Sequence, residues 1–212
     1  MSNPLKIFSN ICSVVFHPVF VPTWLFAFLY FFSSSIFYGL DPKTKTLWFV
    51  MVMYISILFP LLTVFLLWKL KFIESIHMRG LKERYGPLIA SMLFYFWLFW
   101  VFHKRLDAHI MIQTLLGGVF LTTVFVFLAS IFYKISMHTS SWGAACLYAL
   151  IYLFNGYERG LVFFSIILVL AGIVGTARLY LGAHSKKEIY SGYVLGMLAQ
   201  LITYFVLQSL KF

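Results

Sequence analysis

Two short segments in the second half of the chain have residue types and spacings suited to phosphoryl transfer without a metal ion. Arg178, His184 and Glu188 follow the pattern R-x5-H-x3-E directly before the last apolar stretch. The tripeptide Ser-Met-His at 136–138 opens an earlier apolar stretch. Histidine can act as nucleophile, acid or base, and a planar guanidinium suits phosphate oxygens. Because residues four positions apart share a helix face, the carboxylate of Glu188 can reach the ring of His184.

The composition places these residues in a membrane protein. The chain is 62% hydrophobic and only 10% charged, so water cannot be its main solvent. A helix needs roughly 20 apolar residues to cross the hydrocarbon core of a bilayer, and the uncharged stretches lack the alternation of a barrel. We therefore predict an all-α polytopic membrane helix bundle with about seven transmembrane spans. The uncharged stretches are Ile7–Leu40, Thr46–Trp68, Tyr85–His103, Ala108–Tyr133, Ile135–Tyr157, Gly160–Ala177 and Ile189–Leu210.

The N-terminal stretch is too long for one crossing and contains Pro18 and Pro22. We expect an N-terminal interfacial helix over residues 4–16 and the first span over residues 18–38. Pro60 lies inside the second stretch and is expected to kink that span without ending it. The whole chain, residues 1–212, is expected to form a single integral membrane domain.

The polar loops fall on the same side of the membrane when seven spans are counted. Residues 69–86 are rich in charges and are expected to form a polar interfacial segment with an amphipathic face. This segment, the loop around 134–138 and the loop around 178–188 share the side of the N-terminus. That side carries ten of the 16 lysines and arginines, which would place it toward the cytoplasm. Without three arginines expected to bind phosphate, the two sides carry seven and six, so sidedness is left open.

The motif order resembles that of the type 2 phosphatidic acid phosphatase superfamily. Its three motifs are K-x6-R-P, P-S-G-H and S-R-x5-H-x3-D, and the resemblance covers residues 79–211. It implies a membrane helix bundle that dephosphorylates lipid phosphates without a metal or other cofactor. By this resemblance His184 would be the nucleophile that forms a phosphohistidine, and Arg178 would clamp phosphate oxygens. Glu188 stands where the family has aspartate and would hold the imidazole tautomer, while Ala177 replaces the serine.

The second motif keeps its serine and histidine. By resemblance His138 would protonate the leaving alkoxide and then activate water. Ser136 and the amides around Met137 would cradle phosphate at a helix N-terminus, with Met137 in place of glycine.

The first motif departs most from the family pattern. Counting back from Pro87, the family's lysine falls on Arg79 and its arginine falls on Gly86. The phosphate-binding arginine is therefore missing at its expected place. Arg84 and Lys82 lie nearby and are the candidates to replace it.

These observations favour an integral membrane lipid phosphate phosphatase of a bacterial inner (plasma) membrane, with a membrane lipid phosphate as substrate. A non-catalytic relative that binds anionic lipid, or serves as a membrane subunit of a larger assembly, is the alternative. A transporter has little support, because no span interior carries an acid or base for coupling. Nucleic acid is not expected as a partner, no metal site is expected, and the oligomeric state is not indicated. Taken singly, the histidines could be solvated interfacial residues, and Glu188 could simply favour a helix N-terminus.

Overall fold

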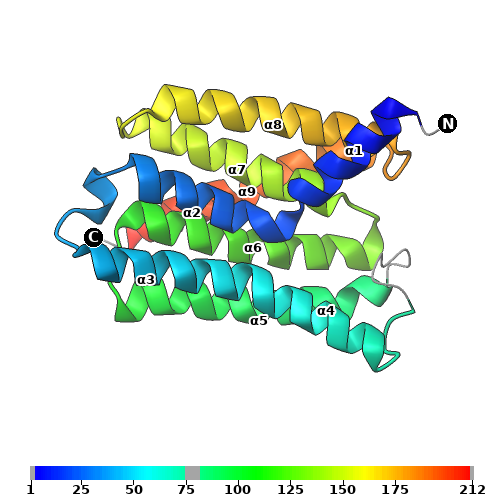
Figure 1. Cartoon of the computed structure of the whole chain (residues 1–212), viewed down its shortest axis with the longest axis horizontal. Coiled ribbons are helices and arrows are strands. Elements are labelled where there is room, and N and C mark those ends of the chain that lie inside the picture. The colour runs from blue at the N-terminus through cyan, green and yellow to red at the C-terminus, as the bar shows by residue number, and fades with distance from the viewer. Residues whose placement is uncertain (1–2, 75–81, 211–212) are drawn as a thin grey trace.

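The computed structural model describes residues 3–74 and 82–210, and within them the chain forms helices and no strand (Figure 1). The predicted all-α class is confirmed. A 3₁₀ turn precedes α2, and π-helical turns follow α3 and α5. The helices are α1 (Pro4–Val15), α2 (Val21–Phe32), α3 (Pro42–Met53), α4 (Phe59–Lys69), α5 (Tyr85–Trp100), α6 (Ile110–Phe132), α7 (Met137–Phe154), α8 (Gly160–Tyr180) and α9 (Lys186–Ser209).

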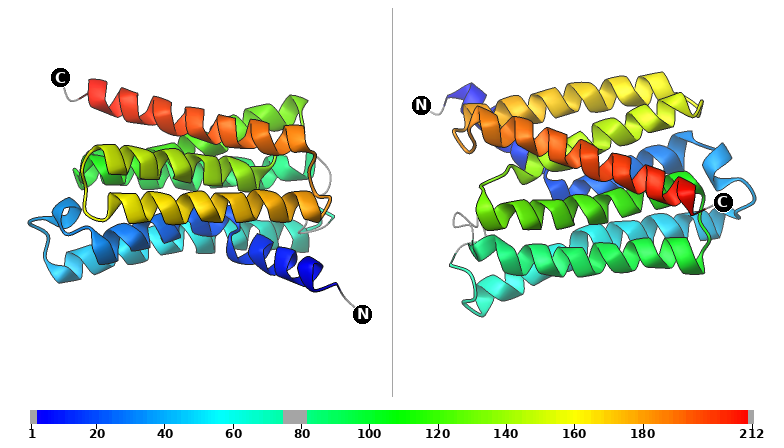
Figure 2. Two further views of the ribbon diagram at one scale, coloured as in Figure 1. Left: turned by 90° about the horizontal axis from the view of Figure 1, so that it is seen from above. Right: turned by 180° about the vertical axis from the view of Figure 1, so that it is seen from behind.

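Five helical segments of the described chain are long and apolar enough to cross a membrane. The segment α1 and the segment Pro18–Phe32 together make a sixth candidate, bent by 42° where they meet (Figure 2). The polytopic helix bundle is confirmed, whereas the count of seven spans stays a prediction. The five segments are Pro42–Lys69, Tyr85–Arg105, Ile110–Phe132, Gly160–Tyr180 and Lys186–Ser209.

The helix that carries Pro60 continues through it, as the sequence predicts. Proline has no backbone N–H, so the carbonyl of Ser56, four residues earlier, loses its usual helical donor. A π-helical turn spans Tyr54–Leu58, and the hydroxyl of Tyr95 in α5 donates to the Ser56 carbonyl oxygen at 3.3 Å. The neighbouring helix therefore supplies the hydrogen bond that proline removes.

The helix α7 corresponds to the span predicted over Ile135–Tyr157 but is not among the five apolar segments. It contacts α2, α6, α8 and α9, and most of its residues are buried. Because its neighbours shield it from lipid, α7 can carry serine, threonine and histidine in its first turns. These polar residues lower the mean hydropathy of α7, so it does not count as an apolar segment. One of them is His138, a candidate catalytic residue, which α7 thereby places inside the bundle.

The α7–α9 contact holds the two motif-bearing ends together. A Cβ atom on Gly196 would meet the carbonyl oxygen of Ser140, and one on Gly192 would meet the hydroxyl of Thr139. These glycines lie one turn apart on α9, so the two backbones approach closely, as small residues permit between membrane helices. The approach continues to the start of α7, where the N–H of Ser136 donates to the carbonyl oxygen of Glu188 at 3.4 Å.

The predicted gathering of polar segments at one end of the bundle is seen in the described residues. The α6–α7 and α8–α9 connections and α1 lie at the same end, and α9 runs from there toward the C-terminus at the other end (Figure 1). The interfacial helix predicted over 69–86 is largely untested, because residues 75–81 lie outside the described residues. Its described flanks are the turn that follows Lys69 and a 3₁₀ turn over Lys82–Arg84. The N-terminal helix is present as α1; its interfacial placement stays a prediction.

Candidate functional site

His184 and Glu188 form a hydrogen-bonded pair at the α8–α9 connection. Gly182 adopts a left-handed conformation, φ 61°, which ends α8 and reverses the chain. Two residues later His184 lies buried, and its Nδ1 is 2.7 Å from Oε2 of Glu188. An ionised carboxylate only accepts hydrogen bonds, so Nδ1 carries the proton and the lone pair of Nε2 is left free. This is the tautomer that a nucleophilic imidazole requires.

Glu188 has a second task at the start of α9. The hydroxyl of Ser185 accepts from the N–H of Glu188 at 3.3 Å, and Oε2 of Glu188 accepts from the N–H of Ser185 at 3.4 Å. These reciprocal bonds form a capping box, which fixes the first turn of α9. The helix-end and the histidine-orienting interpretations of Glu188 are therefore compatible, because the same carboxylate does both.

The surroundings of His184 favour its neutral form. Burial lowers the pKa of His184 below its ordinary value of 6.5, and the positive charge of Arg178 acts in the same direction. The hydrogen bond and the charge of Glu188 raise the pKa and oppose part of this effect. At neutral pH the imidazole is consequently uncharged and able to attack an electrophile.

Arg178 lies in the last turn of α8 with its charge available to an anion. Its Nη1 donates to the hydroxyl oxygen of Ser13 in α1 at 3.2 Å. Its Nε is buried and has no hydrogen-bond partner among the described residues. It also forms no ion pair within that part of the chain. A half-buried guanidinium whose buried Nε is an unused donor is suited to holding phosphate oxygens.

Arg84 joins the same end of the bundle from the turn before α5. Its side chain is buried, and Nη1 donates to the carbonyl oxygen of Ile135 at 3.5 Å. Burial lowers its pKa, while the charge of Glu188 raises it. Arg84 thus lies within electrostatic range of the Glu188 carboxylate. Of the other first-motif candidates, Arg79 lies outside the described residues, and the side chain of Lys82 is not described.

The start of α7 carries Ser136 and Met137 of the second motif. Ser136 is the N-cap, and its hydroxyl oxygen accepts from the N–H of Thr139 at 3.4 Å. Met137 is the first residue of α7 and is not among the described residues with positive φ. Methionine therefore fits here without strain, and the position does not require the glycine of the family motif.

His138 follows in α7 and is held by the N-terminal helix. Its Nε2 is 3.0 Å from the carbonyl oxygen of Ser13, which can only accept, so Nε2 carries the proton. The ring also meets that of His17 edge-on, with centroids 5.1 Å apart. Ser13 thus contacts both His138 and Arg178, one through its carbonyl and one through its hydroxyl.

Three residues of this site carry no motif signal in the sequence: Ser13, His17 and Lys134. The amine of Lys134 donates to the carbonyl oxygen of Ala183 at 3.3 Å, beside His184. His17 precedes Pro18, a pair that indicates a helix break and nothing more. The long separation from His138 along the chain hides the contact of Ser13 from any local pattern.

The histidines of the loop before α6 lie at the opposite end of the bundle and have structural contacts. Nδ1 of His103 is 2.7 Å from Oε1 of Gln113, and His109 caps α6 by accepting from the N–H of Met111. They take no part in the site.

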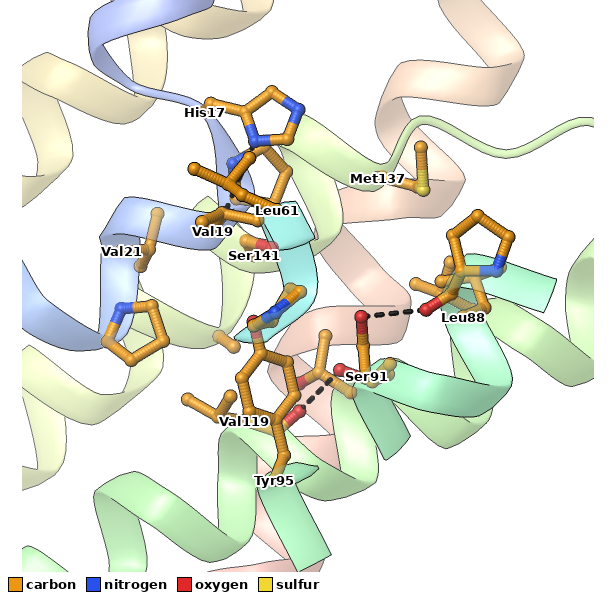
Figure 3. A pocket seen from close by; sticks show the side chains of 18 of the residues that line it. His17, Val19, Val21, Leu61, Leu88, Ser91, Tyr95, Val119, Met137 and Ser141 are labelled. Carbon is orange, nitrogen blue, oxygen red and sulfur yellow. Dashed lines mark hydrogen bonds between the residues drawn. The ribbon is translucent and has the colours of Figure 1, made fainter. Parts of the chain in front are cut away.

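A cavity of about 460 Å³ extends from the site into the bundle. Its lining comes from α2, α4, α5, α6, α7 and α9 and is predominantly apolar. His17 and Met137 line one end, and Tyr95 lies deeper inside (Figure 3). Arg84 also belongs to the lining, whereas His138, Arg178, His184 and Glu188 do not. The volume lies within the range of small-molecule pockets, roughly 300–1,000 Å³. The geometry therefore joins a polar, cationic head region to an apolar chamber.

Residues 129–211 match the model of the PAP2 superfamily. This segment is therefore similar to that superfamily. The PAP2 match contains the second and third motifs and runs from the end of α6 through α9. Members of that superfamily are generally phosphatases, so the matched segment resembles a phosphatase. A search of curated proteins and a search of solved structures each returned no match. The extension of the resemblance to residue 79, which includes Arg84, lies outside the PAP2 match and stays a prediction.

The Glu188→Gln variant should lower kcat and move the acid limb of the pH profile to lower pH. Glu188 raises the pKa of His184, so its removal lets the imidazole stay neutral at still lower pH. The amide can also stabilise the wrong tautomer, and we expect kcat to fall by about 100-fold or more. The measurement is kcat/KM for a lipid phosphate between pH 4 and pH 8. The control Glu158→Gln, at the opposite end of the bundle, should keep the acid limb of the wild-type pH profile. If the acid limb of Glu188→Gln stayed in place or moved to higher pH, the pairing of Glu188 with His184 would be refuted.

Proposed function

We propose that the chain is an integral membrane lipid phosphate phosphatase that hydrolyses a phosphomonoester or pyrophosphate through a phosphohistidine. The observation that supports this most is the His184–Glu188 pair near the half-buried Arg178, whose Nε is an unused donor, with an apolar cavity nearby that Arg84 and Met137 line. The phosphate would bind between Arg178, Arg84 and the N-terminus of α7. The apolar part of the lipid would lie in the cavity.

The reaction would proceed in two displacements. Nε2 of His184 attacks phosphorus, and the bond to the leaving oxygen breaks. His138, which must carry a proton on each ring nitrogen for this step, gives its Nε2 proton to that oxygen and becomes neutral; the leaving oxygen takes the place of the Ser13 carbonyl as acceptor. His138 then removes a proton from water, whose oxygen attacks phosphorus and breaks the P–N bond. Inorganic phosphate leaves, and His184 and His138 return to their starting forms.

The charge of the site supports this chemistry. A phosphoryl group spreads negative charge over its oxygens in the transition state, and fixed cations stabilise it most where water is excluded. Arg178 and Arg84 are buried or half-buried, and the Lys134 amine is near His184. A bacterial inner membrane is our proposed location.

The test is phosphate release by the detergent-solubilised protein from a panel of lipid phosphates, with a chelator present. The panel contains phosphatidic acid, phosphatidylglycerophosphate and a polyprenyl pyrophosphate. We expect release that the chelator does not reduce and that vanadate, a mimic of transferring phosphate, inhibits. If the folded protein released no phosphate from any lipid yet bound anionic lipid, the non-catalytic relative would be the better account.

A further inference from the structure

Two hydroxyl groups in the lining of the cavity behind the site have no hydrogen-bond partner among the described residues. Thr122 of α6 and Ser141 of α7 both line it. The Thr122 hydroxyl is buried and has no hydrogen-bond partner among the described residues. The Ser141 hydroxyl forms no hydrogen bond with that part of the chain either. Figure 3 shows Ser141 in the middle of the lining, between His17 and Tyr95.

Other hydroxyls of the same lining are already paired. Ser91 donates to the carbonyl oxygen of Pro87 at 2.8 Å, and Thr123 donates to that of Val119 at 2.8 Å. Serine and threonine in membrane helices commonly bond to the preceding turn in this way. Thr122, next to Thr123 on the same helix, does not. The unpaired state is therefore specific to the two positions and not a property of all hydroxyls in the cavity.

Helix packing places the two hydroxyls at one depth. A Cβ on Gly118 of α6 would meet the side chain of Gln200 of α9, and one on Gly196 would meet Ser140 of α7. The helices α6 and α9 run in opposite directions. Thr122 lies four residues after Gly118 in α6, which is one turn closer to the site. Gly196 lies four residues before Gln200 in α9, which is also one turn closer to the site. Thr122 is consequently level with Ser140, the neighbour of the second hydroxyl.

This depth is one helical turn below the proposed phosphate position. Ser141 lies four residues after Met137, about 6 Å along the axis of α7 at a rise of 1.5 Å per residue. A phosphate at the start of α7 would be followed, at this depth, by the first atoms of the lipid beyond its head group. In an acylglycerol phosphate these include ester carbonyl oxygens, whereas an isoprenoid phosphate has only hydrocarbon there.

An unpaired hydroxyl in an apolar cavity gains most from an acceptor that enters with the ligand. We propose that Thr122 and Ser141 donate to an ester carbonyl of the lipid, and that the substrate is an ester-linked acyl lipid phosphate. This inference rests on the proposed phosphatase function. Sites built to hydrogen-bond a substrate group discriminate strongly against analogues that lack it, because the protein groups are then left unpaired. Thr122 and Ser141 are thus specificity-determining residues that belong to none of the three motifs.

The test compares an ester-linked diacylglycerol phosphate with its ether-linked analogue of equal chain length. We expect the wild-type protein to show a kcat/KM for the ester about tenfold higher than for the ether, which lacks the carbonyls. In the double variant Thr122→Val and Ser141→Ala the ratio should fall to about one, mainly through loss of activity on the ester. Thr123→Val removes a neighbouring hydroxyl that is already paired, and should keep the wild-type ratio.

An unchanged ratio in the double variant, or a wild-type preference for an isoprenoid phosphate, would overturn the inference while leaving the phosphatase function intact. If no lipid phosphate were hydrolysed, the phosphatase function itself would fail. Equilibrium binding of the ester and ether lipids to the same variants then decides the inference separately. Tighter binding of the ester that disappears in the double variant supports it, and equal binding refutes it.

Discussion

The His184→Ala variant should lose turnover of lipid phosphates by about 10,000-fold or more, as removal of a catalytic nucleophile does in other covalent mechanisms. Nε2 of His184 is the atom left with a free lone pair by the hydrogen bond from Nδ1 to Glu188. His138 differs, because its Nε2 carries a proton and donates to the Ser13 carbonyl oxygen. The measurement is phosphate release, together with rapid alkaline quenching of protein mixed with labelled substrate. Labelled phosphohistidine should form in the wild type and be absent from the variant.

Folding is controlled with a histidine at the other end of the bundle. His103→Gln can keep a hydrogen bond to Gln113 and should retain wild-type turnover. His184→Ala should also keep the elution profile and melting behaviour of the wild type, since the capping box of α9 uses Ser185 and Glu188. Turnover by His184→Ala within tenfold of wild type would exclude His184 as the nucleophile.

The Arg84→Ala variant should lower kcat/KM by about 100- to 1,000-fold, the usual effect of removing one group that stabilises transition-state charge. The family's first motif has its arginine where this chain has Gly86, and Arg84 is the buried cation nearest that place that the structure describes. The charge of Glu188 acts on Arg84, which places it at the site electrostatically. The measurement is kcat/KM for a lipid phosphate at two salt concentrations.

Two further variants make this result specific. Arg84→Lys keeps the charge but not the planar fork, and should recover only part of the loss. Arg105→Ala removes a cation that lies over the ring of Trp100 at the opposite end, and should keep wild-type kcat/KM. Near wild-type activity in Arg84→Ala would instead assign the first-motif cation to Arg79 or Lys82.

Local patterns predict the parts of the site that depend on neighbours in the sequence. His184 and Glu188 are four residues apart, so their contact follows from helix geometry once α9 begins nearby. The all-α class follows from apolar stretches that only helices can carry through a bilayer. The placement of the polar loops at one end of the bundle follows from successive helices that run in opposite directions. The catalytic roles of these residues stay predictions, because no comparison tests them.

Contacts between distant segments were beyond the reach of sequence patterns. Ser13 reaches His138 across 125 positions, and neither residue's surroundings indicate the other. The count of apolar segments omits α7 for a different physical reason. Protein, not lipid, surrounds α7, so it can be polar. Met137 fits a helix start without strain, a point that residue type alone leaves open. Arg84 could be named as a candidate, but its burial depends on how α5 meets α7.

The opposite positions of the two chain ends have a practical consequence for protein engineering. Ser13 of α1 touches two residues of the proposed site, and α9 carries the chain away to Leu210 at the far end of the bundle (Figure 1). An affinity tag on the first residues would extend from α1, at the same end of the bundle as the proposed phosphate-binding groups. A tag or topology reporter fused after α9 leaves them untouched. Such a reporter would also mark the membrane face opposite to the one that carries the proposed site.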